Sequence, residues 1–246
     1  MQGAQRNRRL LLAQLHYLPL IWSQQTIPLA APTIRLQPAG SAGLGSGRAA
    51  QLAAAYDPPP GTFRWRRGYP STLTSLWRPG RPNLVLTGAV MAFESQHGLP
   101  LNHSAGPRVW SALLRAAARK QRNAKGYTYA LARKGSPETL TVWHNGSVLM
   151  KTLANTGIPA SPTADGTFPV YLRFQFTIMS GFNPDGSHYS DPVWWVSYFN
   201  GGDAVHYFPR ASYGFPQSLG CVELQWGPAK RIWPYMNYGT LVSVVN

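Results

Sequence analysis

From residue 137 onward, the chain consists of short strand patterns separated by turns, which restricts it to a small set of folds. Residues 139–143 alternate with period two, and Asn145-Gly146 then gives a tight turn into a second strand pattern over 147–152. Further strand patterns lie at residues 167–176, 193–199, 204–208, 221–224 and 240–245. Only residues 228–236 offer a short helical candidate, so the pattern predicts an antiparallel β-sandwich or barrel-like sheet.

Residues 63–136, in contrast, have mostly helical patterns. Thr87 is a suitable N-cap for one helix, and Gly98 stands where a glycine would end it. Gly106-Pro107 opens a second helix with proline at its first position. The apolar stripe of that helix comprises Val109, Trp110, Leu113, Leu114 and Ala117. These patterns predict a small helical bundle.

The expected fold class is therefore α+β, with a small helical N-terminal domain followed by a mainly antiparallel β-sandwich over residues 137–246. The helical domain comprises residues 1–22, as its first helix or the remnant of a leader, and residues 63–126. A Pro-, Ala- and Gly-rich insertion or linker over 23–62 separates these two parts. Residues 127–136 are expected to be a connector between the two domains.

The start of the chain allows two interpretations. Basic residues followed by an apolar stretch have the outline of a signal peptide. The alternative is an amphipathic helix over Leu10–Leu18 that belongs to the first domain. No apolar run reaches the roughly 20 residues that a membrane span needs, so we expect no transmembrane span.

The net charge of +15 is confined to the first half of the chain. Residues 1–136 contain 18 Lys and Arg against Asp57 and Glu94, which gives +16, whereas residues 137–246 contain 5 against 6, which gives −1. A basic half is suited to nucleic acid, an anionic membrane surface or an anionic polymer such as a cell wall. The aromatic residues that would stack on bases gather in the near-neutral half, so nucleic acid is not the expected partner.

Cys221 is the only cysteine, which excludes an intrachain disulfide and a cysteine-rich zinc site. A buried, inert thiol is the usual fate of cysteine. However, Ser218 and Gly220 are loop residues that we expect to expose backbone and side chain, as an active-site turn requires. A nucleophilic cysteine needs a base, and His206 is the best placed of the six histidines. It ends a strand pattern fifteen residues before Cys221, and two strands joined by such a loop can face each other.

Residues 205–224 resemble the active-site signature of the L,D-transpeptidases of the YkuD type. The residues that match this signature are His206, Gly214, Ser218, Gly220 and Cys221. Upstream, residues 155–173 resemble the T-P-x-G-x-F segment of the family, through Pro162, Thr163, Gly166 and Phe168. Downstream, residues 239–242 resemble its closing G-T-x-V strand. The resemblance thus spans about residues 137–246 and identifies them as an L,D-transpeptidase-like catalytic domain.

This resemblance implies a peptidoglycan L,D-transpeptidase that forms cross-links between stem peptides. Cys221 would attack a stem-peptide carbonyl and form a thioester, with His206 as the base. A neighbouring stem's amine would then capture the acyl group. The resemblance further implies that the turn formed by Ser218, Leu219 and Gly220 holds the oxyanion, that the cysteine captures carbapenems, and that no metal or cofactor is needed.

Three positions depart from the family's common pattern. Tyr207 replaces the glycine after the histidine, so the group that orients the imidazole is expected to differ. Leu219 has no acid–base group, and Glu223 stands where arginine is frequent, which puts in doubt how the substrate's carboxylates are held. The expected substrate contacts are Tyr207, Gly214 and Glu223. Four aromatic residues are candidates to line the cleft, although core packing is expected for at least half of them: Tyr171, Trp194, Trp195 and Tyr198.

Residues 87–114 resemble the second half of a peptidoglycan-binding domain, which is a small three-helix module. The matching residues are Val90, Phe93, Glu94, Gly98, Leu99, Gly106, Trp110 and Leu113. Residues 10–22 resemble the first helix of that module, separated from the rest by the Pro/Ala/Gly-rich insertion.

The two resemblances together imply an extracytoplasmic protein of the bacterial cell wall or periplasm. Its expected partners are peptidoglycan stem peptides and glycan, together with anionic wall polymers. Two alternatives stay open. A cysteine endopeptidase or carboxypeptidase acting on wall peptides would use the same Cys221 and His206 but pass the acyl group to water. A non-catalytic wall-binding protein would leave both residues without a role.

Overall fold

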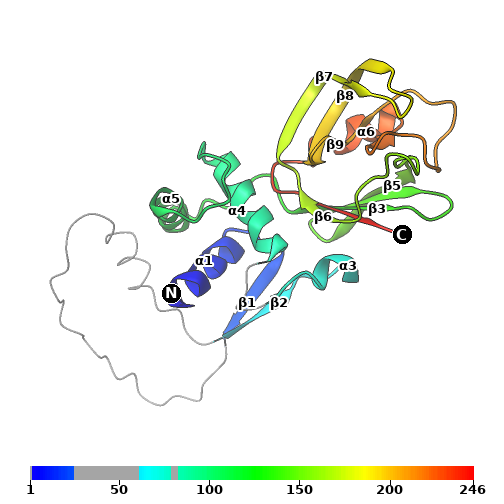
Figure 1. The fold of residues 1–246 in the computed structure, drawn as a ribbon. Coiled ribbons are helices and arrows are strands. Elements are labelled where there is room, and N and C mark those ends of the chain that lie inside the picture. Colours follow the sequence, from blue (N-terminus) through cyan, green and yellow to red (C-terminus); the bar gives the residue numbers. More distant parts are fainter. Residues whose placement is uncertain (1, 25–60, 79–82) are drawn as a thin grey trace, which may run out of the picture.

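The computed structural model describes residues 2–24, 61–78 and 83–246. Within these residues, the N-terminal part contains four helices, α1 (Gln2–Gln14), α3 (Ser71–Thr74), α4 (Leu84–Gln96) and α5 (Pro107–Ala118). It also contains a two-stranded antiparallel sheet formed by β1 (Leu20–Gln24) and β2 (Gly61–Trp65). Figure 1 shows this part on one side and the two larger sheets on the other. The expected insertion lies outside the described residues, except for its ends in β1 and β2.

The ends of the N-terminal helices differ in part from expectation. The first helix stops at Gln14, and residues up to 22 do not continue it because β1 begins at Leu20. Asn83 caps α4, since its side-chain oxygen accepts a hydrogen bond from the Leu86 N–H at 2.9 Å, so the predicted cap at Thr87 is wrong. Gly98 follows the end of α4 with φ of +63°, and Pro107 is the first residue of α5, as predicted.

Two sheets form a sandwich in the second part of the chain. The five-stranded sheet has the order β5-β4-β3-β11-β6, and the four-stranded sheet has the order β10-β9-β8-β7. The first comprises β3 (Thr128–Arg133), β4 (Thr139–His144), β5 (Ser147–Leu153), β6 (Gly166–Pro169) and β11 (Leu241–Val245). The second comprises β7 (Leu172–Phe182), β8 (His188–Asn200), β9 (Asp203–Tyr207) and β10 (Val222–Leu224). Helix α6 (Trp226–Ile232) follows β10.

The expected α+β class with a mainly antiparallel sandwich is confirmed, with two parallel strand pairs, β3–β11 and β9–β10. The predicted turn at Asn145-Gly146 joins β4 to β5, and both residues have positive φ. The strand predicted over 167–176 is two strands that belong to different sheets, β6 and β7.

The expected connector over residues 127–136 is wrong, because this segment contains β3. This strand pairs with β4 on one side and with β11 on the other, at the centre of its sheet. Its residues from Thr128 to Arg133 are buried up to Ala132, so both faces are covered. A strand that is buried on both faces lacks the polar–apolar alternation by which we recognised the other strands.

The two faces of β3 belong to different hydrophobic cores. Ala130 and Ala132 face the core between the two sheets. Tyr129 and Leu131 instead pack with the N-terminal helices, in a core that includes residues from α1, α4 and α5. The approach is close, because a Cβ added to Gly88 of α4 would lie 2.4 Å from the carbonyl oxygen of Gly239. The helices are therefore packed directly on the outer face of the five-stranded sheet.

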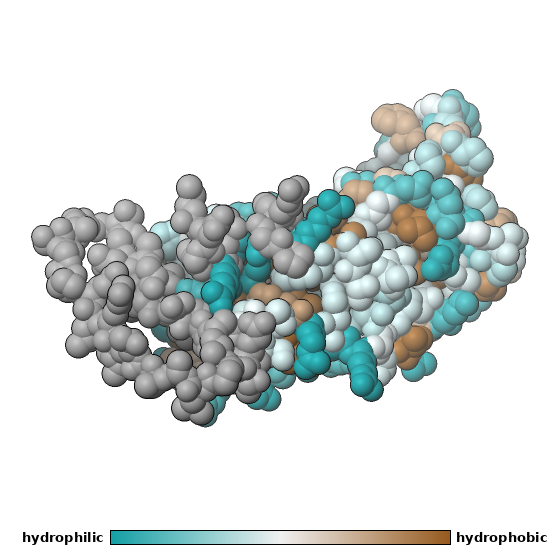
Figure 2. Space-filling model, turned by 90° about the horizontal axis from the view of Figure 1, so that it is seen from below, coloured by the Kyte–Doolittle hydropathy of each residue, from teal (hydrophilic) through white to brown (hydrophobic). Residues whose placement is uncertain are grey.

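The surface carries its apolar residues unevenly. On the face of the molecule seen in Figure 2, they form separate small patches among hydrophilic residues. Strand β7 is the most apolar exposed element, with these large side chains open to solvent: Leu172, Phe174, Phe176, Ile178 and Phe182. None of the helices in the described ranges combines the length and the apolar character needed to cross a membrane.

Candidate active site

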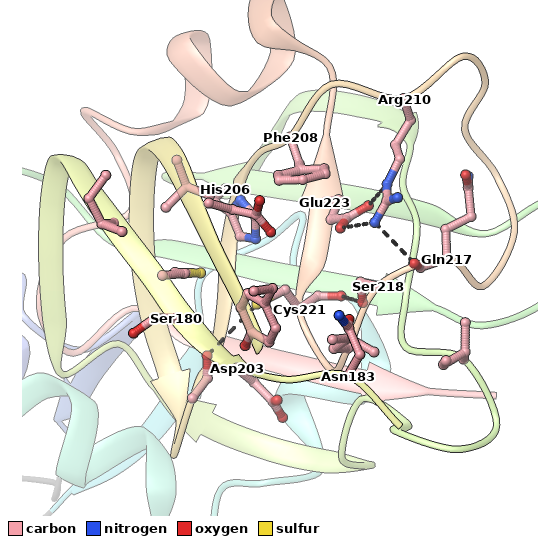
Figure 3. Close-up of a pocket in the computed structure, with 18 of the residues that line it drawn as sticks. Ser180, Asn183, Asp203, His206, Phe208, Arg210, Gln217, Ser218, Cys221 and Glu223 are labelled. Atoms are coloured by element: carbon pink, nitrogen blue, oxygen red, sulfur yellow. Dashed lines mark hydrogen bonds and ion pairs between the residues drawn. The ribbon is translucent and has the colours of Figure 1, made fainter. Parts of the chain in front are cut away.

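A cavity of about 810 Å³ lies beside β9 and β10. The β7–β8 hairpin covers part of it with residues such as Ile178, Tyr189 and Asp191. Strand β9 contributes Asp203 and His206. Most of the remaining lining comes from the loop after β9 and from the segment around the cysteine, with Leu219 and, as Figure 3 shows, Phe208, Arg210, Gln217, Ser218, Cys221 and Glu223.

The pairing of β9 with β10 brings the predicted nucleophile and base to this cavity. The two strands are parallel, with Val205 beside Val222 and His206 beside Glu223. Side chains two residues apart on a strand point to the same face, so Cys221 and Glu223 lie on the face of His206. Val205 and Val222 point to the opposite face, into the sandwich core. The separation of fifteen residues is therefore a loop that returns the chain to a neighbouring strand.

The geometry of His206 defines its tautomer. Its Nδ1 lies 2.9 Å from the carbonyl oxygen of Tyr207, and a carbonyl can only accept a hydrogen bond, so Nδ1 carries the proton. The Nε2 of the neutral ring is then an acceptor. Burial lowers the pKa of His206 below its ordinary value of 6.5, which makes the ring neutral at pH 7. The imidazole is thus in the form that can take a proton.

Tyr207 orients the imidazole through its own backbone carbonyl, although it replaces the usual glycine. Its side chain points to the other face of the sheet, where its ring meets that of Trp226 at 5.0 Å. It does not line the cavity, so the expectation that it contacts substrate is not supported.

The Cys221 thiol is protonated at neutral pH. Burial raises its pKa to about 12, and the carboxylates of Asp203 and Glu223 add to this effect, while the Ala204 N–H opposes it. The sulfur lies 3.8 Å from the carbonyl oxygen of Gly202, to which the thiol donates a weak hydrogen bond. The thiol is partly exposed in the cavity. It therefore needs a base before it can act as a nucleophile.

The turn before Cys221 is held from within. Ser218 is buried rather than exposed as expected, and its hydroxyl donates to the carbonyl oxygen of Cys221 at 2.6 Å. The Gly220 N–H donates to the same hydroxyl at 3.3 Å. Gly220 has φ of +112°, and a Cβ added to it would lie 2.4 Å from a carboxylate oxygen of Asp203. Glycine is thus required at 220 for both backbone conformation and space.

The upstream segment of the resemblance braces this turn. The Thr156 carbonyl accepts hydrogen bonds from the N–H groups of Gln217 and Ser218, at 2.9 and 3.0 Å. Thr163 accepts from the Gly157 N–H at 2.8 Å, and its hydroxyl donates to the Cys221 carbonyl at 3.5 Å. Residues 155–163 therefore fix the backbone on both sides of the cysteine.

Glu223 is paired with an arginine that the sequence reasoning missed. Arg210 donates from Nε and Nη2 to the two carboxylate oxygens of Glu223, both at 2.8 Å (Figure 3). It is the one Lys or Arg among the residues that line the cavity. The sequence offers part of the information needed to find this pair, since a glutamate that is buried requires a charged or hydrogen-bonding partner. The sequence does not show which of the 23 basic residues provides it.

The other expected site residues have structural contacts. Gly214 lies outside the cavity lining, where its N–H donates to the Ala154 carbonyl and the Asn155 side chain. Of the four aromatic candidates, only Tyr198 lines the cavity. Tyr189 and Asp191 of β8 were missed, because their place in a hairpin that folds over the cavity is not visible in the sequence. Within the described part of the chain, no group of His, Cys, Asp or Glu is arranged to bind a metal ion.

Solved structures of L,D-transpeptidases are similar to this chain. One from Mycobacterium smegmatis is 26% identical, with a TM-score of 0.44, and the match covers 48% of this chain and 58% of the other. L,D-transpeptidase 3 from Mycobacterium tuberculosis, in complex with a faropenem-derived adduct, is 22% identical, with a TM-score of 0.45 and coverage of 49% and 60%. This chain therefore spans little more than half the length of either protein.

A third structure is the catalytic domain alone of an E. faecium L,D-transpeptidase. It is 25% identical, with a TM-score of 0.44, and the match covers 48% of this chain and 95% of that domain. No curated protein matches the chain. The model of the YkuD family, the L,D-transpeptidase catalytic domain, matches residues 127–244. This part of the chain, just under half of its length, is therefore similar to the L,D-transpeptidase catalytic domain of the YkuD family.

Proposed function

We propose that the protein is a peptidoglycan L,D-transpeptidase that cross-links stem peptides through a thioester on Cys221. The observation that carries this proposal is that a protonated thiol and a neutral imidazole line one cavity of the segment that matches the YkuD family. The imidazole can accept the proton that the thiol must lose. No second cysteine is available in the chain to act as the nucleophile.

Acylation begins when the Cys221 sulfur attacks the carbonyl carbon of the donor stem's third residue. The S–H proton passes to Nε2 of His206 as the C–S bond forms. The tetrahedral intermediate collapses with cleavage of the C–N bond to the terminal D-alanine. The imidazolium then returns its proton to the departing nitrogen, so the products are a thioester, free D-alanine and a neutral His206.

Transfer follows when the amine of a neighbouring stem attacks the thioester carbonyl. The amine gives up a proton to His206 as its C–N bond forms, and the C–S bond breaks. The imidazolium returns the proton to the sulfur, which restores the thiol. The net reaction exchanges one amide bond for another, and no redox partner is consumed.

The backbone before the cysteine is suited to hold the oxyanion of both intermediates. The turn and loop hydrogen bonds between backbone groups of the described residues include none from the N–H groups of Leu219 and Cys221, whereas the Gly220 N–H is bonded to Ser218. Fixed N–H groups aimed at a developing oxyanion provide a large part of acyl-transfer catalysis. The bonds from Ser218 and Thr163 to the Cys221 carbonyl keep this backbone in place.

An enzyme with this substrate acts outside the cytoplasm, in the bacterial cell wall or periplasm. Its partners are peptidoglycan stem peptides and glycan, and the basic N-terminal half is suited to anionic wall polymers.

The test is incubation of the full chain with a disaccharide-tetrapeptide, followed by mass spectrometry of the products. Cross-linked dimers and free D-alanine are expected. In parallel, exposure to a carbapenem is expected to add one inhibitor mass per chain. The control is Cys221→Ala, a small change that removes the only thiol and is expected to abolish both the dimers and the adduct.

The alternatives give different products in the same experiment. Shortened stem peptides without dimers would assign the protein as a carboxypeptidase or endopeptidase, because the thioester would then have passed to water. Neither dimers nor shortened peptides, with no carbapenem adduct, would leave a non-catalytic wall-binding protein. Dimers formed by Cys221→Ala at the rate of the unaltered chain would remove Cys221 as the nucleophile.

A further inference from the structure

Glu223 occupies the position next to His206 in the parallel pair of β9 and β10. Neighbouring strands lie about 4.8 Å apart, and both side chains point to the same face. Glu223 is only 4% exposed, so its carboxylate is removed from most solvent screening. An opposite charge at such a distance favours the protonated form of a histidine. An unrestrained Glu223 would therefore tend to pair with an imidazolium, which cannot act as a base.

Arg210 binds both oxygens of the Glu223 carboxylate. Its Nε donates to one oxygen and its Nη2 to the other, both at 2.8 Å. Such paired, charge-assisted hydrogen bonds fix both distance and plane. The Asn155 side chain lies 3.5 Å from the oxygen that Nε contacts, which adds a donor from a third direction.

The guanidinium of Arg210 is itself fixed by the elements that bear the reacting groups. Its Nη2 also donates to the Gln217 carbonyl at 3.0 Å, next to the turn that leads to Cys221. The central guanidinium carbon, Cζ, lies 4.7 Å from the ring centre of Phe208. The rings of Phe208 and His206 in turn contact each other edge to face, with their centres 6.3 Å apart. Arg210 thus connects the strand of the base, the strand of Glu223 and the cysteine turn.

We propose that Arg210 is a positioning residue for the base: by holding both oxygens of Glu223, it keeps this carboxylate from pairing with His206 and leaves the imidazole free to take the Cys221 proton. The inference rests on the role proposed above for His206. It explains how a glutamate is tolerated two residues after the cysteine, on the face that His206 occupies.

The groups around His206 fix the direction of the expected effect. Glu223 of β10 and Asp191 of β8 both raise the pKa of His206, while Arg210 lowers it. Cys221, on the same face, is protonated and contributes no charge at neutral pH. Loss of Arg210 should therefore raise the pKa of His206, and loss of Glu223 should lower it. Removal of both should bring it back toward the original value.

The experiment is an NMR titration of the full chain that follows the His206 ring signal, assigned by its absence in His206→Gln. The variants are Arg210→Gln, Glu223→Gln and the double variant. The expected pKa of His206 rises by about one unit in Arg210→Gln and returns to within about half a unit of the original in the double variant. An unchanged pKa in Arg210→Gln, or equal values in that variant and the double one, would overturn the proposal.

A second readout is the rate of acylation by a carbapenem across pH. Arg210→Gln should lose about tenfold near pH 6 and recover most of this by pH 8, because only the acid limb of the profile moves. Arg210→Lys, which retains the charge, should lose less. A purely structural role would lower the rate equally at every pH, and that result would contradict the proposal.

The ring signals of the other five histidines show whether each variant is folded. If Arg210→Gln does not fold, Arg210→Lys takes its place in the titration, because an ammonium keeps the charge but cannot hold both oxygens of Glu223 as a planar fork. A His206 pKa above the original value is then expected, and an unchanged pKa contradicts the proposal. The titration needs no reaction, so a chain that forms no acyl-enzyme would refute the proposed function while the titration still decides the role of Arg210.

Discussion

Cys221 and His206 begin the proposed reaction uncharged. Burial raises the pKa of the thiol to about 12 and lowers that of the imidazole, so a thiolate–imidazolium pair is not the resting state. Proton transfer then accompanies the attack on the carbonyl instead of preceding it. A resting thiol is also less exposed to oxidation than a thiolate.

The first prediction concerns His206→Gln. The rate of carbapenem acylation at pH 7 should fall by about 10², the usual scale for the loss of a general base. Because the pKa of the thiol is about 12, the deficit should persist up to pH 10 rather than fade near the ordinary thiol pKa. The unaltered protein should gain activity as pH rises through the His206 pKa, which lies below 6.5, since only the neutral ring accepts a proton.

The measurement is the second-order rate of adduct formation by intact mass between pH 5 and 10. A loss below threefold at pH 7, or full recovery by pH 9, would mean that another group is the base.

The second prediction concerns Gly220→Ala. The added Cβ would lie 2.4 Å from a carboxylate oxygen of Asp203, at a residue with φ of +112°. The turn must shift, and the N–H groups beside the sulfur shift with it, so acylation should fall by about 10² or more. The matched control is Gly135→Ala, where a Cβ would have nothing within 4 Å. Equal acylation rates in the two variants would show that the turn does not need this conformation.

At the scale of elements, prediction succeeded where a pattern is local. The β4–β5 hairpin was visible because period-two alternation meets an Asn-Gly turn, and both features lie within a few residues. Strand β3 was missed because its two faces belong to two cores, so every residue from Thr128 to Ala132 is buried and no alternation remains.

The candidate site shows the same division. The sequence motifs placed His206 and Cys221 together, and both line one cavity. The partner of Glu223 could not be predicted, because Arg210 reaches it only through the fold of an intervening loop. Likewise, nothing local shows that β8 would bring Tyr189 and Asp191 over the cavity, since this depends on how the hairpin curves.

The third prediction tests the start of α4. Asn83→Ala should lower the free energy of unfolding by about 1 kcal/mol, because the Leu86 N–H loses its side-chain acceptor. Thr87→Ala is the matched control, since the Thr87 hydroxyl donates only to the Asn83 carbonyl at 3.3 Å. Urea unfolding of both variants provides the comparison. A larger loss for Thr87→Ala would restore the cap that the sequence suggested.

At the scale of the whole molecule, charge and chemistry are separated. The first 136 residues hold +16, and the remainder, with the candidate site, holds −1. The end of α5 and the turn after it present exposed Arg115, Arg119 and Arg122 to solvent. We expect this half to bind the enzyme to anionic wall polymers, independently of the reaction.

The fourth prediction tests this division in the full chain. Replacement of Arg115, Arg119 and Arg122 by Gln should weaken sedimentation with purified wall at least about threefold at low salt, since exposed ion pairs contribute about 0.2–1 kcal/mol each. The difference should shrink near ~0.5 M salt, where the Debye length is short. The rate of carbapenem acylation should not change.

The matched control removes the same charge from the other half, through Gln at the exposed Lys151, Lys230 and Arg231. Equal loss of wall binding in both triple variants would show that only net charge matters, and would refute a dedicated basic half.

The fifth prediction concerns a chain that begins at Tyr127. Without the N-terminal helices, Tyr129, Leu131 and Leu241, which are at most 2% exposed, would face water. Each such exposure costs about 1.5–3 kcal/mol, a sum comparable to the whole stability of a domain. The shortened chain should aggregate or melt at a much lower temperature than the full chain. An unchanged melting temperature by calorimetry would mean that the helices are dispensable to the sheet.

The contact of Gly88 with Gly239 ties the N-terminal helices to the catalytic segment. Family similarity starts at Tyr127, yet the backbone of α4 sits against the backbone that leads into β11, with no room for a side chain between them. If this catalytic segment were joined to a different N-terminal sequence, that sequence would have to provide the same close backbone contact with Gly239. The segment that matches the family model is therefore shorter than the segment that must stay together to keep this packing, which includes the helices.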